Sequence, residues 1–235
     1  MAVAFRHSYR RRFLEGARLA WAAGVLAATA VAAAPGMDGA DAPQVHQRAS
    51  ERIAAEKAAG EDARAAAKGD ATARDRLVLH AQRGDASAQF YLALLYKEGQ
   101  GVAKDEARYV ALLRQAGEQD HPGAQSRLIG IYEEGTGVPR DPMQAAQWAR
   151  RAAEQGELAG QLALVKDYYF GRGVARSYVE AIKWQAILEA RGLVAKDDEF
   201  TRELEAAAGA VQAEEGRALA REWLKGPKPA PGAGR

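Results

Sequence analysis

Apolar residues recur at helical spacing through the middle of the chain, in segments that resemble one another. Ala88, Leu92 and Leu95 lie three or four residues apart, and the same spacing returns from Ala124 onward. This spacing predicts an amphipathic helix. In each segment a glycine-rich turn follows, and then a second stretch at helical spacing. Alanine is abundant and β-branched residues are sparse, so the composition also favours helix over strand.

The glycine-rich turns recur at a fixed interval. EGQGV occupies 98–102, EGTGV occupies 134–138 and FGRGV occupies 170–174, an interval of 36 residues both times. A fixed period of this size predicts a stacked array of helical repeats. The positions to which the period assigns a structural role are Leu92, Tyr96, Gly99, Gly101, Asp105, Leu128, Tyr132, Gly135, Gly137, Asp141, Trp148, Leu164, Tyr168, Gly171, Gly173, Ser177 and Trp184.

These recurrent residues have structural explanations. The first glycine of each turn can adopt the left-handed conformation that ends a helix. Asp105, Asp141 and Ser177 are suited to cap the next helix, and Pro142 suits a first helical position. We expect the tyrosine and tryptophan columns to form the core. The G-x-G strings follow a helix and lack the third glycine of a dinucleotide fingerprint, which argues against a nucleotide-binding loop.

The repeated unit reads A-Q-x-x-L-x-x-x-Y-x-x-G-x-G-V-x-x-D-x-x-x-A-x-x-W-x-x-x-A-A-E-Q-G, and it resembles the Sel-one-like repeat (SLR), a relative of the tetratricopeptide repeat. The copy from Ala124 through Gly156 fits best. The first copy has Leu112 in place of tryptophan, and the third has Gly160 and Ser177 in place of Ala and Asp. The resemblance implies an all-α, right-handed α/α solenoid whose concave face binds a protein or peptide, without catalytic, cofactor or metal residues.

The repeats divide the chain into segments. Three SLR repeats are predicted over 84–192, with bounds 84–119, 120–155 and 156–192. A degenerate capping repeat is predicted over 49–83, including a helix from Ala49 to Lys68 that is broken or weakened at Gly60. Capping helices are predicted over 193–225, with a helix end at 206–209. A flexible linker over 33–48 and a disordered tail over 226–235 complete the prediction.

The first 32 residues have the pattern of a secretory signal. Five arginines precede an apolar run of 16 residues from Leu19 to Ala34, which contains an A-x-A pattern at 30–32. RRRFL at 10–14 resembles the twin-arginine export signal. We therefore expect a periplasmic or secreted protein. The alternative is an uncleaved anchor in the inner membrane, which would be the chain's contact with a membrane and would leave the rest facing the periplasm.

Charge and composition exclude several partners and cofactors. The chain has 33 basic and 31 acidic residues. Removing residues 1–32 leaves 28 basic and 30 acidic residues, a formal net charge of −2, so no nucleic-acid partner is expected. The sequence has no cysteine, which excludes disulfides, thiolate metal sites and cysteine nucleophiles. Its four histidines have no partner at metal-ligand spacing.

Tetratricopeptide geometry places the unpacked residues of each first helix on the inner face. The resemblance therefore implies that a protein or peptide partner touches Phe90, Leu94, Lys97, Glu98, Ser126, Glu133, Glu134, Leu162, Lys166, Tyr169 and Phe170. Phe90 and the Tyr169–Phe170 pair are the candidate aromatic anchors, since aromatic side chains often carry binding energy. The alternative is that Phe90 and Phe170 pack between neighbouring repeats.

The function expected from these observations is a non-enzymatic scaffold that mediates protein–protein interaction in the bacterial cell envelope. Catalytic, cofactor and metal residues are all predicted to be none. Two alternatives stay open. The protein could bind or hydrolyse peptidoglycan or a small molecule, or the repeats could mediate self-association.

Overall fold

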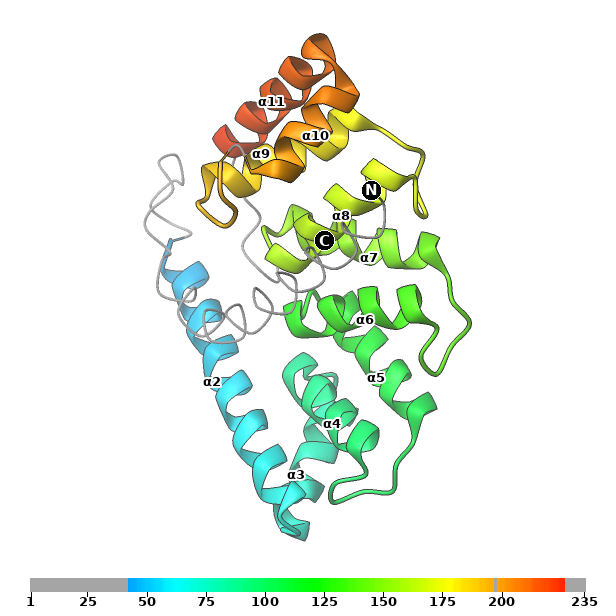
Figure 1. Ribbon diagram of the computed structural model, residues 1–235. Helices are drawn as coiled ribbons and strands as arrows, with labels where there is room; N and C mark the ends of the chain where they lie inside the picture. The colour runs from blue at the N-terminus through cyan, green and yellow to red at the C-terminus, as the bar shows by residue number, and fades with distance from the viewer. Residues whose placement is uncertain (1–41, 197, 227–235) are drawn as a thin grey trace. The chain divides into compact units, whose positions relative to one another are not determined.

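The structure, a computed structural model, describes residues 42–196 and 198–226. Across these residues the chain forms ten helices and no strand (Figure 1). The all-α fold class predicted from the sequence is therefore confirmed. The predicted signal segment (1–32), residues 33–41 of the predicted linker and residues 227–235 of the predicted tail lie outside the described residues.

The chain divides into two compact units, Met1–Ile53 and Ala54–Arg235. Of the first unit, the structure describes the beginning of helix α2 (Ala42–Ala67). This helix begins before Ala49, inside the range predicted to be a flexible linker, so that part of the prediction is corrected. Proline is tolerated in a first helical turn, and Pro43 stands there.

Helix α2 also continues through Gly60, where the sequence predicted a break. Gly60 is buried, and a Cβ atom at this position would lie 3.2 Å from the ring of Tyr91 on helix α4. Ala59, Ala63 and Ala66 are buried with it. Tertiary packing of this small-residue face therefore outweighs the weak helix propensity of one glycine.

The second unit consists of antiparallel helical hairpins stacked side by side (Figure 1). Each of the three predicted repeats contains one hairpin of two 13-residue helices. The helices that follow α2 are α3 (Ala71–Gln82), α4 (Ala86–Glu98), α5 (Glu106–Glu118), α6 (Pro122–Glu134), α7 (Pro142–Glu154), α8 (Leu158–Phe170), α9 (Tyr178–Ala190), α10 (Glu199–Ala208) and α11 (Ala210–Lys225).

The turn between the two helices of a repeat has the predicted geometry. Gly171 ends α8 with φ of 69°, a left-handed conformation that residues with a Cβ rarely adopt. Gly173 has φ of 67°, and a Cβ there would lie 2.0 Å from the carbonyl oxygen of Pro142. The hydroxyl of Ser177 then accepts a hydrogen bond from the N–H of Glu180 and caps α9. Thus the turn is fixed by backbone sterics, by contact with the preceding repeat and by a helix cap.

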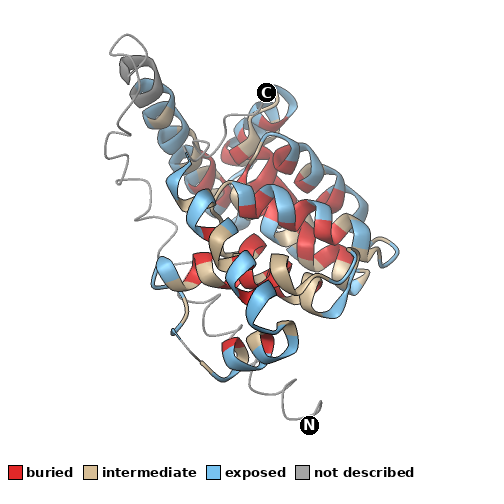
Figure 2. Ribbon diagram, turned by 90° about the horizontal axis from the view of Figure 1, so that it is seen from above, coloured by how far each residue is buried: buried red, intermediate tan, exposed pale blue. Residues whose placement is uncertain are grey.

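Large apolar side chains fill the space between the helices. The buried faces point toward neighbouring helices, as the red segments of Figure 2 show. Leu128, Leu164, Trp148 and Trp184 are all buried, in agreement with their repeat positions. At roughly 25 cal/mol per Å² of apolar surface, burial of such side chains is the main favourable term in the stability of the array.

The tyrosine column is only partly buried. Tyr132 is buried, whereas Tyr96 and Tyr168 are half-buried, which corrects the expectation of a fully buried column. Each tyrosine hydroxyl accepts a hydrogen bond from an arginine. Arg108 donates to Tyr96, Arg114 to Tyr132 and Arg150 to Tyr168, with distances of 2.8, 2.7 and 2.8 Å. The rings therefore pack at the edge of the core while their polar ends are satisfied near solvent.

A buried glutamine joins each repeat to the one before it. Its side-chain amide donates to a carbonyl oxygen eight residues earlier, at the end of the preceding second helix. The pairs are Gln89 with Ala81 at 3.2 Å, Gln125 with Gly117 at 3.1 Å and Gln161 with Ala153 at 3.4 Å. The last carbonyl groups of a helix have no hydrogen-bond donor within the helix. Because stacking of the repeats buries these carbonyl groups, the glutamine amides supply the donors that they would otherwise lack.

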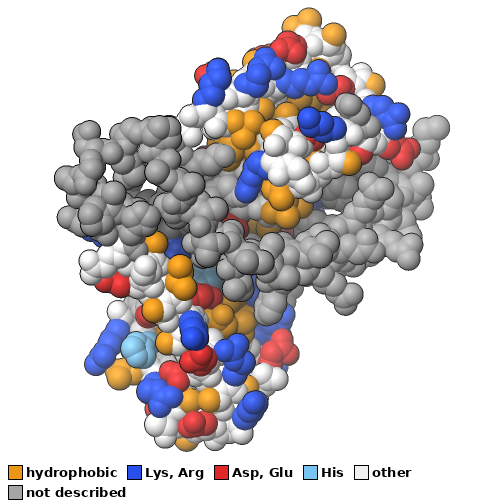
Figure 3. Space-filling model, turned by 90° about the vertical axis from the view of Figure 1, so that its left-hand side faces the viewer, with side chains coloured by type: hydrophobic (Ala, Val, Ile, Leu, Met, Phe, Trp, Pro, Cys, Tyr) orange, Lys and Arg blue, Asp and Glu red, His pale blue; other side chains and the backbone are white. Residues whose placement is uncertain are grey.

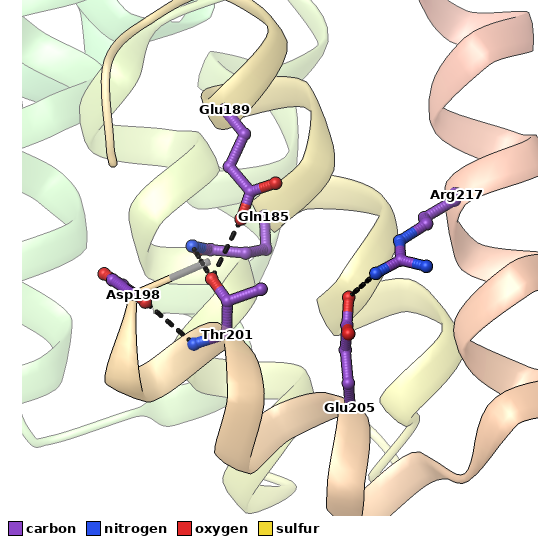
Figure 4. A network of polar contacts seen from close by, with 6 residues as sticks. All are labelled: Gln185, Glu189, Asp198, Thr201, Glu205 and Arg217. Carbon is purple, nitrogen blue, oxygen red and sulfur yellow. Dashed lines mark hydrogen bonds and ion pairs between the residues drawn. The ribbon is translucent and has the colours of Figure 1, made fainter. Parts of the chain in front are cut away.

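Helices α10 and α11 cover the last repeat. The hydroxyl of Thr201 accepts a hydrogen bond from Gln185 at 2.9 Å and donates one to Glu189 at 2.8 Å (Figure 4). Trp223 meets Trp184 edge to face at 5.8 Å. These contacts attach α10 and α11 to α9 and shield its apolar surface, as the end of a repeat array requires. The predicted helix end at 206–209 is confirmed, since α10 stops at Ala208.

In the part of the chain that the structure describes, none of the helices combines the length and hydropathy needed to cross a bilayer.

Gly160 provides a test of how closely the repeats stack. A Cβ there would lie 2.5 Å from both the Ala149 carbonyl oxygen and the Ala153 nitrogen on α7. Gly-to-Ala in a helix normally stabilises by about 1 kcal/mol. We expect Gly160→Ala instead to lower the free energy of unfolding by about 1–3 kcal/mol, because α7 and α8 must move apart. Urea unfolding followed by circular dichroism measures this change.

Gly130 on α6 is the matched control, because a Cβ there meets nothing within 4 Å. Gly130→Ala should raise the free energy of unfolding by about 0.5–1 kcal/mol. Stabilisation by both substitutions would show that α7 and α8 are not in close contact.

Candidate partner-binding site

The predicted partner residues lie on the first helices of the three hairpins, α4, α6 and α8. Their exposure differs from residue to residue. Glu98, Ser126, Glu134 and Phe170 are exposed; Leu94, Lys97, Glu133, Leu162, Lys166 and Tyr169 are half-buried; Phe90 is buried. Their role in binding stays a prediction, and their surroundings show which of them a partner could reach.

Phe90 packs inside the array. Its ring stacks on His121 with centroids 4.4 Å apart, and His121 caps α6 by accepting a hydrogen bond from the N–H of Ala124. The other ring nitrogen of His121 lies 3.1 Å from the Glu56 carboxylate of α2. Phe90 therefore packs between neighbouring repeats, which is the alternative that its sequence position left open, and it is not an available anchor.

Glu56 joins this contact from the helix that precedes the repeats. Burial by itself would raise the pKa of its carboxyl, but hydrogen bonds from His121, Ser87 and Tyr91 lower the pKa to about 2. The ionised carboxylate thus holds the second half of α2 against α4 and the start of α6.

The end of α8 carries a cluster of aromatic rings. Tyr169 meets Phe170, Tyr178 and Phe200 at centroid distances of 4.8, 5.9 and 5.6 Å. Phe170 keeps 36% of its surface exposed, and the guanidinium of Arg172 lies 4.6 Å from its ring centroid. Of the two candidate aromatic anchors, the Tyr169–Phe170 pair is therefore the one that presents apolar surface to solvent.

Charges of both signs are interspersed on the side of the molecule drawn in Figure 3, where Lys and Arg alternate with Asp and Glu. Lys166 on α8 pairs with Glu133 on α6, so two of the predicted residues are in contact across neighbouring repeats. Such mixed surfaces suit recognition of a protein better than recognition of a polyanion.

A cavity of about 190 Å³ lies where the ends of α6 and α8 meet the start of α7. Glu133, Glu134, Asp167, Arg140 and Arg172 line it, with Pro142 and Ala145. We call it the Asp167 pocket. Asp167 is 2% exposed, and its Oδ2 atom has no hydrogen-bond partner among the described residues.

The environment of Asp167 disfavours its charge. Burial raises the pKa of the Asp167 carboxyl to about 7; Lys166 opposes this rise, the negative charge of Glu133 adds to it, and Arg172 opposes it. A carboxyl that changes charge near neutral pH in a pocket is a candidate functional group.

The described residues include no cluster of His, Cys, Asp and Glu arranged to hold a metal ion. His80 is exposed on α3, and His121 serves as a helix cap. The ionisable residues that line the Asp167 pocket are carboxylates and arginines, which can bind polar groups of a partner.

Three stretches of the chain match the Sel1 repeat, at residues 86–121, 125–157 and 161–184. The chain is also similar to the crystal structure of a Sel1 repeat protein from Oxalobacter formigenes. Sequence identity is 33%, the match covers 55% of this chain and 92% of that one, and the TM-score is 0.46. The chain belongs to the Sel1 repeat family.

A second similar structure is that of a protective antigen present in uropathogenic Escherichia coli strains, which displays an SLR fold. Identity is 29%, and the match covers 69% of this chain and 42% of that chain with a TM-score of 0.48. Comparison with curated proteins gave no match. Sel1 repeat proteins are typically non-catalytic scaffolds that bind protein partners.

Within this Sel1 repeat protein, Asp167, Arg140 and Arg172 line the pocket but were not among the predicted site residues. The sequence nevertheless carried a signal. Asp167 lies 36 residues after Ile131, which itself lies 36 residues after Leu95. Leu95 and Ile131 are buried apolar side chains. The third repeat therefore places a carboxyl in a column that the other two fill with hydrocarbon.

Replacing Asp167 with leucine should stabilise the isolated protein, and the gain should depend on pH. The folded-state pKa of about 7 lies above the ordinary value of 3.8, so ionisation penalises folding as pH rises. We expect the stability difference between Asp167→Leu and wild type to grow from pH 4 to pH 7 and then level off. Each unit of pKa difference adds about 1.4 kcal/mol. Urea unfolding across this pH range measures it.

Asp167→Asn is the control, since it keeps the shape of the side chain and removes the titration. The difference in unfolding free energy between Asp167→Asn and wild type should change with pH as it does for Asp167→Leu. It should lack the constant contribution that the apolar leucine side chain adds. A difference that is constant from pH 4 to pH 8 would contradict the raised pKa.

Proposed function

We propose that this Sel1 repeat protein is a non-enzymatic scaffold that binds a protein or peptide on the face formed by α4, α6 and α8. The observation that carries the proposal is the exposed aromatic ring of Phe170 next to the half-buried Tyr169, with the half-buried Leu162 two turns earlier on the same helix. Packing of the repeats buries most large apolar side chains, so apolar surface left at the end of α8 fits an interface.

The second helices use their largest side chains in packing between repeats, as Trp148 and Trp184 show. Met143, at the start of α7, is exposed but has no exposed aromatic ring beside it on that helix. The first helices of the later repeats instead combine apolar surface with charged residues, as at Leu162 and Glu134. An interface of this kind has an apolar centre surrounded by polar groups.

We further propose that the protein acts in the cell envelope after export. The arginine-rich start, the apolar run from Leu19 to Ala34 and the A-x-A pattern at 30–32 support this proposal. In fractionated cells, we expect the protein in the periplasmic fraction with a new N-terminus close to residue 33. Full-length protein in the cytoplasmic fraction would contradict export, and full-length protein in the inner membrane would favour the anchored alternative.

Immobilised full-length protein should capture a specific protein from envelope extract, which mass spectrometry identifies and which is then purified for direct affinity measurement. We expect Phe170→Ala combined with Leu162→Ala to weaken that affinity about tenfold or more, because each substitution removes apolar contact from the interface. Circular dichroism should be unchanged.

The control for this experiment lies outside the face formed by α4, α6 and α8. Val211 on α11 is 83% exposed. Val211→Ala should leave the affinity unchanged. A partner that responds to Val211→Ala and ignores the substitutions on α8 would show that binding occurs elsewhere.

A further inference from the structure

A groove of about 560 Å³ lies between α3 and the turn that joins α4 to α5. Its lining includes Arg74 and Val78 of α3, Tyr96 of α4, Lys104 of the turn and Arg108 of α5. We call it the Tyr96 groove. None of these residues belongs to the set that the sequence analysis assigned to partner binding, so the groove is a separate surface of the protein.

The groove occurs where the first repeat departs from the other two. In the second and third repeats, the tyrosine hydroxyl accepts a hydrogen bond from an arginine that lies 18 residues earlier, on the preceding second helix. The pairs are Arg114 with Tyr132 and Arg150 with Tyr168. The equivalent residue before Tyr96 is Val78, which is shorter than arginine and has no donor. The space that an arginine would occupy beside Tyr96 therefore contributes to the groove.

Tyr96 and Arg108 supply hydrogen-bond donors beside this space. The hydroxyl of Tyr96 accepts a hydrogen bond of 2.8 Å from Nη1 of Arg108, whose guanidinium lies 5.3 Å from the tyrosine ring centroid. A tyrosine hydroxyl that accepts one hydrogen bond keeps its own proton for donation, and a guanidinium has further N–H groups. A ligand atom that binds here is therefore favoured if it is an acceptor.

Basic side chains outnumber acidic ones in the lining of the groove. Arg74, Lys104 and Arg108 line it together with one acid, Asp105. One oxygen of Asp105 accepts a hydrogen bond of 2.9 Å from the backbone N–H of Arg108 and caps α5, and the other lies 3.3 Å from Nε of Arg108. The carboxylate of Asp105 is thus engaged within the wall, and the lining carries an excess of positive charge.

Two of the basic side chains also have acidic neighbours outside the lining. Arg74 lies 2.9 Å from Asp75, and Lys104 lies 3.4 Å from Glu106. Each of these four side chains is at least 38% exposed. Exposed ion pairs contribute little to stability, because water solvates the separated charges nearly as well. A carboxylate that enters the groove can therefore replace these two partners at small cost.

We propose that the Tyr96 groove binds the glutamate side chains of an acidic segment of a protein partner. The glutamate carboxylate accepts hydrogen bonds from Arg108 and the hydroxyl of Tyr96, and Val78 in the lining contacts its methylene groups. A carboxylate suits this lining better than a phosphate, because Asp105 repels a doubly charged group more strongly. This inference goes beyond the proposed function, which concerns the face formed by α4, α6 and α8.

The test titrates tetraglutamate, acetylated and amidated at its ends, into the full-length protein and measures binding by calorimetry. We expect saturable binding that weakens severalfold when NaCl is raised from 50 to 300 mM, because salt screens the exposed charges. Combining Arg74→Gln with Lys104→Gln should weaken the affinity about fivefold. Absence of saturable binding would overturn the proposal.

Val78→Arg distinguishes a shaped groove from a merely positive surface. The new arginine would restore the pairing that Arg114 makes with Tyr132, fill the space beside Tyr96 and take its hydroxyl. We expect Val78→Arg to weaken binding of tetraglutamate at least threefold although it adds a positive charge. Equal or tighter binding by Val78→Arg would overturn the proposal, since attraction to overall charge would then explain the result.

Arg150→Gln is the matched control. Arg150 donates to Tyr168 in the third repeat and does not line the groove, so its loss removes one positive charge elsewhere. Arg150→Gln should leave the affinity for tetraglutamate unchanged. A loss as large as that of the Arg74→Gln and Lys104→Gln variant would contradict a specific site.

Two further probes test the chemistry of the ligand. Tetralysine with the same end groups should not bind at the groove, and inorganic phosphate should bind more weakly than tetraglutamate. The reverse order for either probe would overturn the assignment of a carboxylate ligand. Phe170→Ala combined with Leu162→Ala should leave tetraglutamate binding unchanged, so the groove and the proposed partner face on α8 are tested separately.

Discussion

The contact between the second helix of one repeat and the first helix of the next is the constraint on which the structure depends. A single hairpin cannot bury both of its faces, so every repeat relies on its neighbours. At α7 and α8 the approach is so close that Gly160 leaves no room for a Cβ. The glutamine column, represented by Gln161 and the carbonyl of Ala153, completes the same contact with a hydrogen bond. Close apolar packing and the hydrogen bond that pairs a buried carbonyl group therefore occur at the same contact between α7 and α8.

This constraint divides the residues by role. Side chains at the contacts between helices, such as Leu128, Trp148 and Trp184, are buried and stabilise the stacked array. The part of the first helices that does not contact a neighbouring helix is available for other contacts, and the exposed ring of Phe170 lies there. Asp167 departs from this division, since it is buried at an interface position and yet lines a cavity. A carboxyl at this position weakens the core, where the other repeats place hydrocarbon.

Part of the candidate site follows from the resemblance to tetratricopeptide geometry, which assigns Glu133, Glu134 and Lys166 to the inner face. The structure pairs Glu133 with Lys166 and places Glu133 and Glu134 at one cavity, while their contact with a partner stays a prediction. Phe90 shows the limit of that register. Its ring is covered by His121, which is distant in sequence and reaches it only because α6 starts beside α4. Periodicity predicts which side of a helix a residue occupies, but it does not predict what covers that side.

The sequence by itself determined the helical hairpins, their length and their turns, because these depend on local spacing, helix caps and glycines with left-handed backbone. Asp105, Gly99 and their equivalents could be assigned on that ground. Only the tertiary structure decided that α2 continues through Gly60 and that Asp167 opens onto a pocket. Both outcomes depend on side chains brought from other helices, and distances between helices are set by packing over the whole interface rather than by any local pattern.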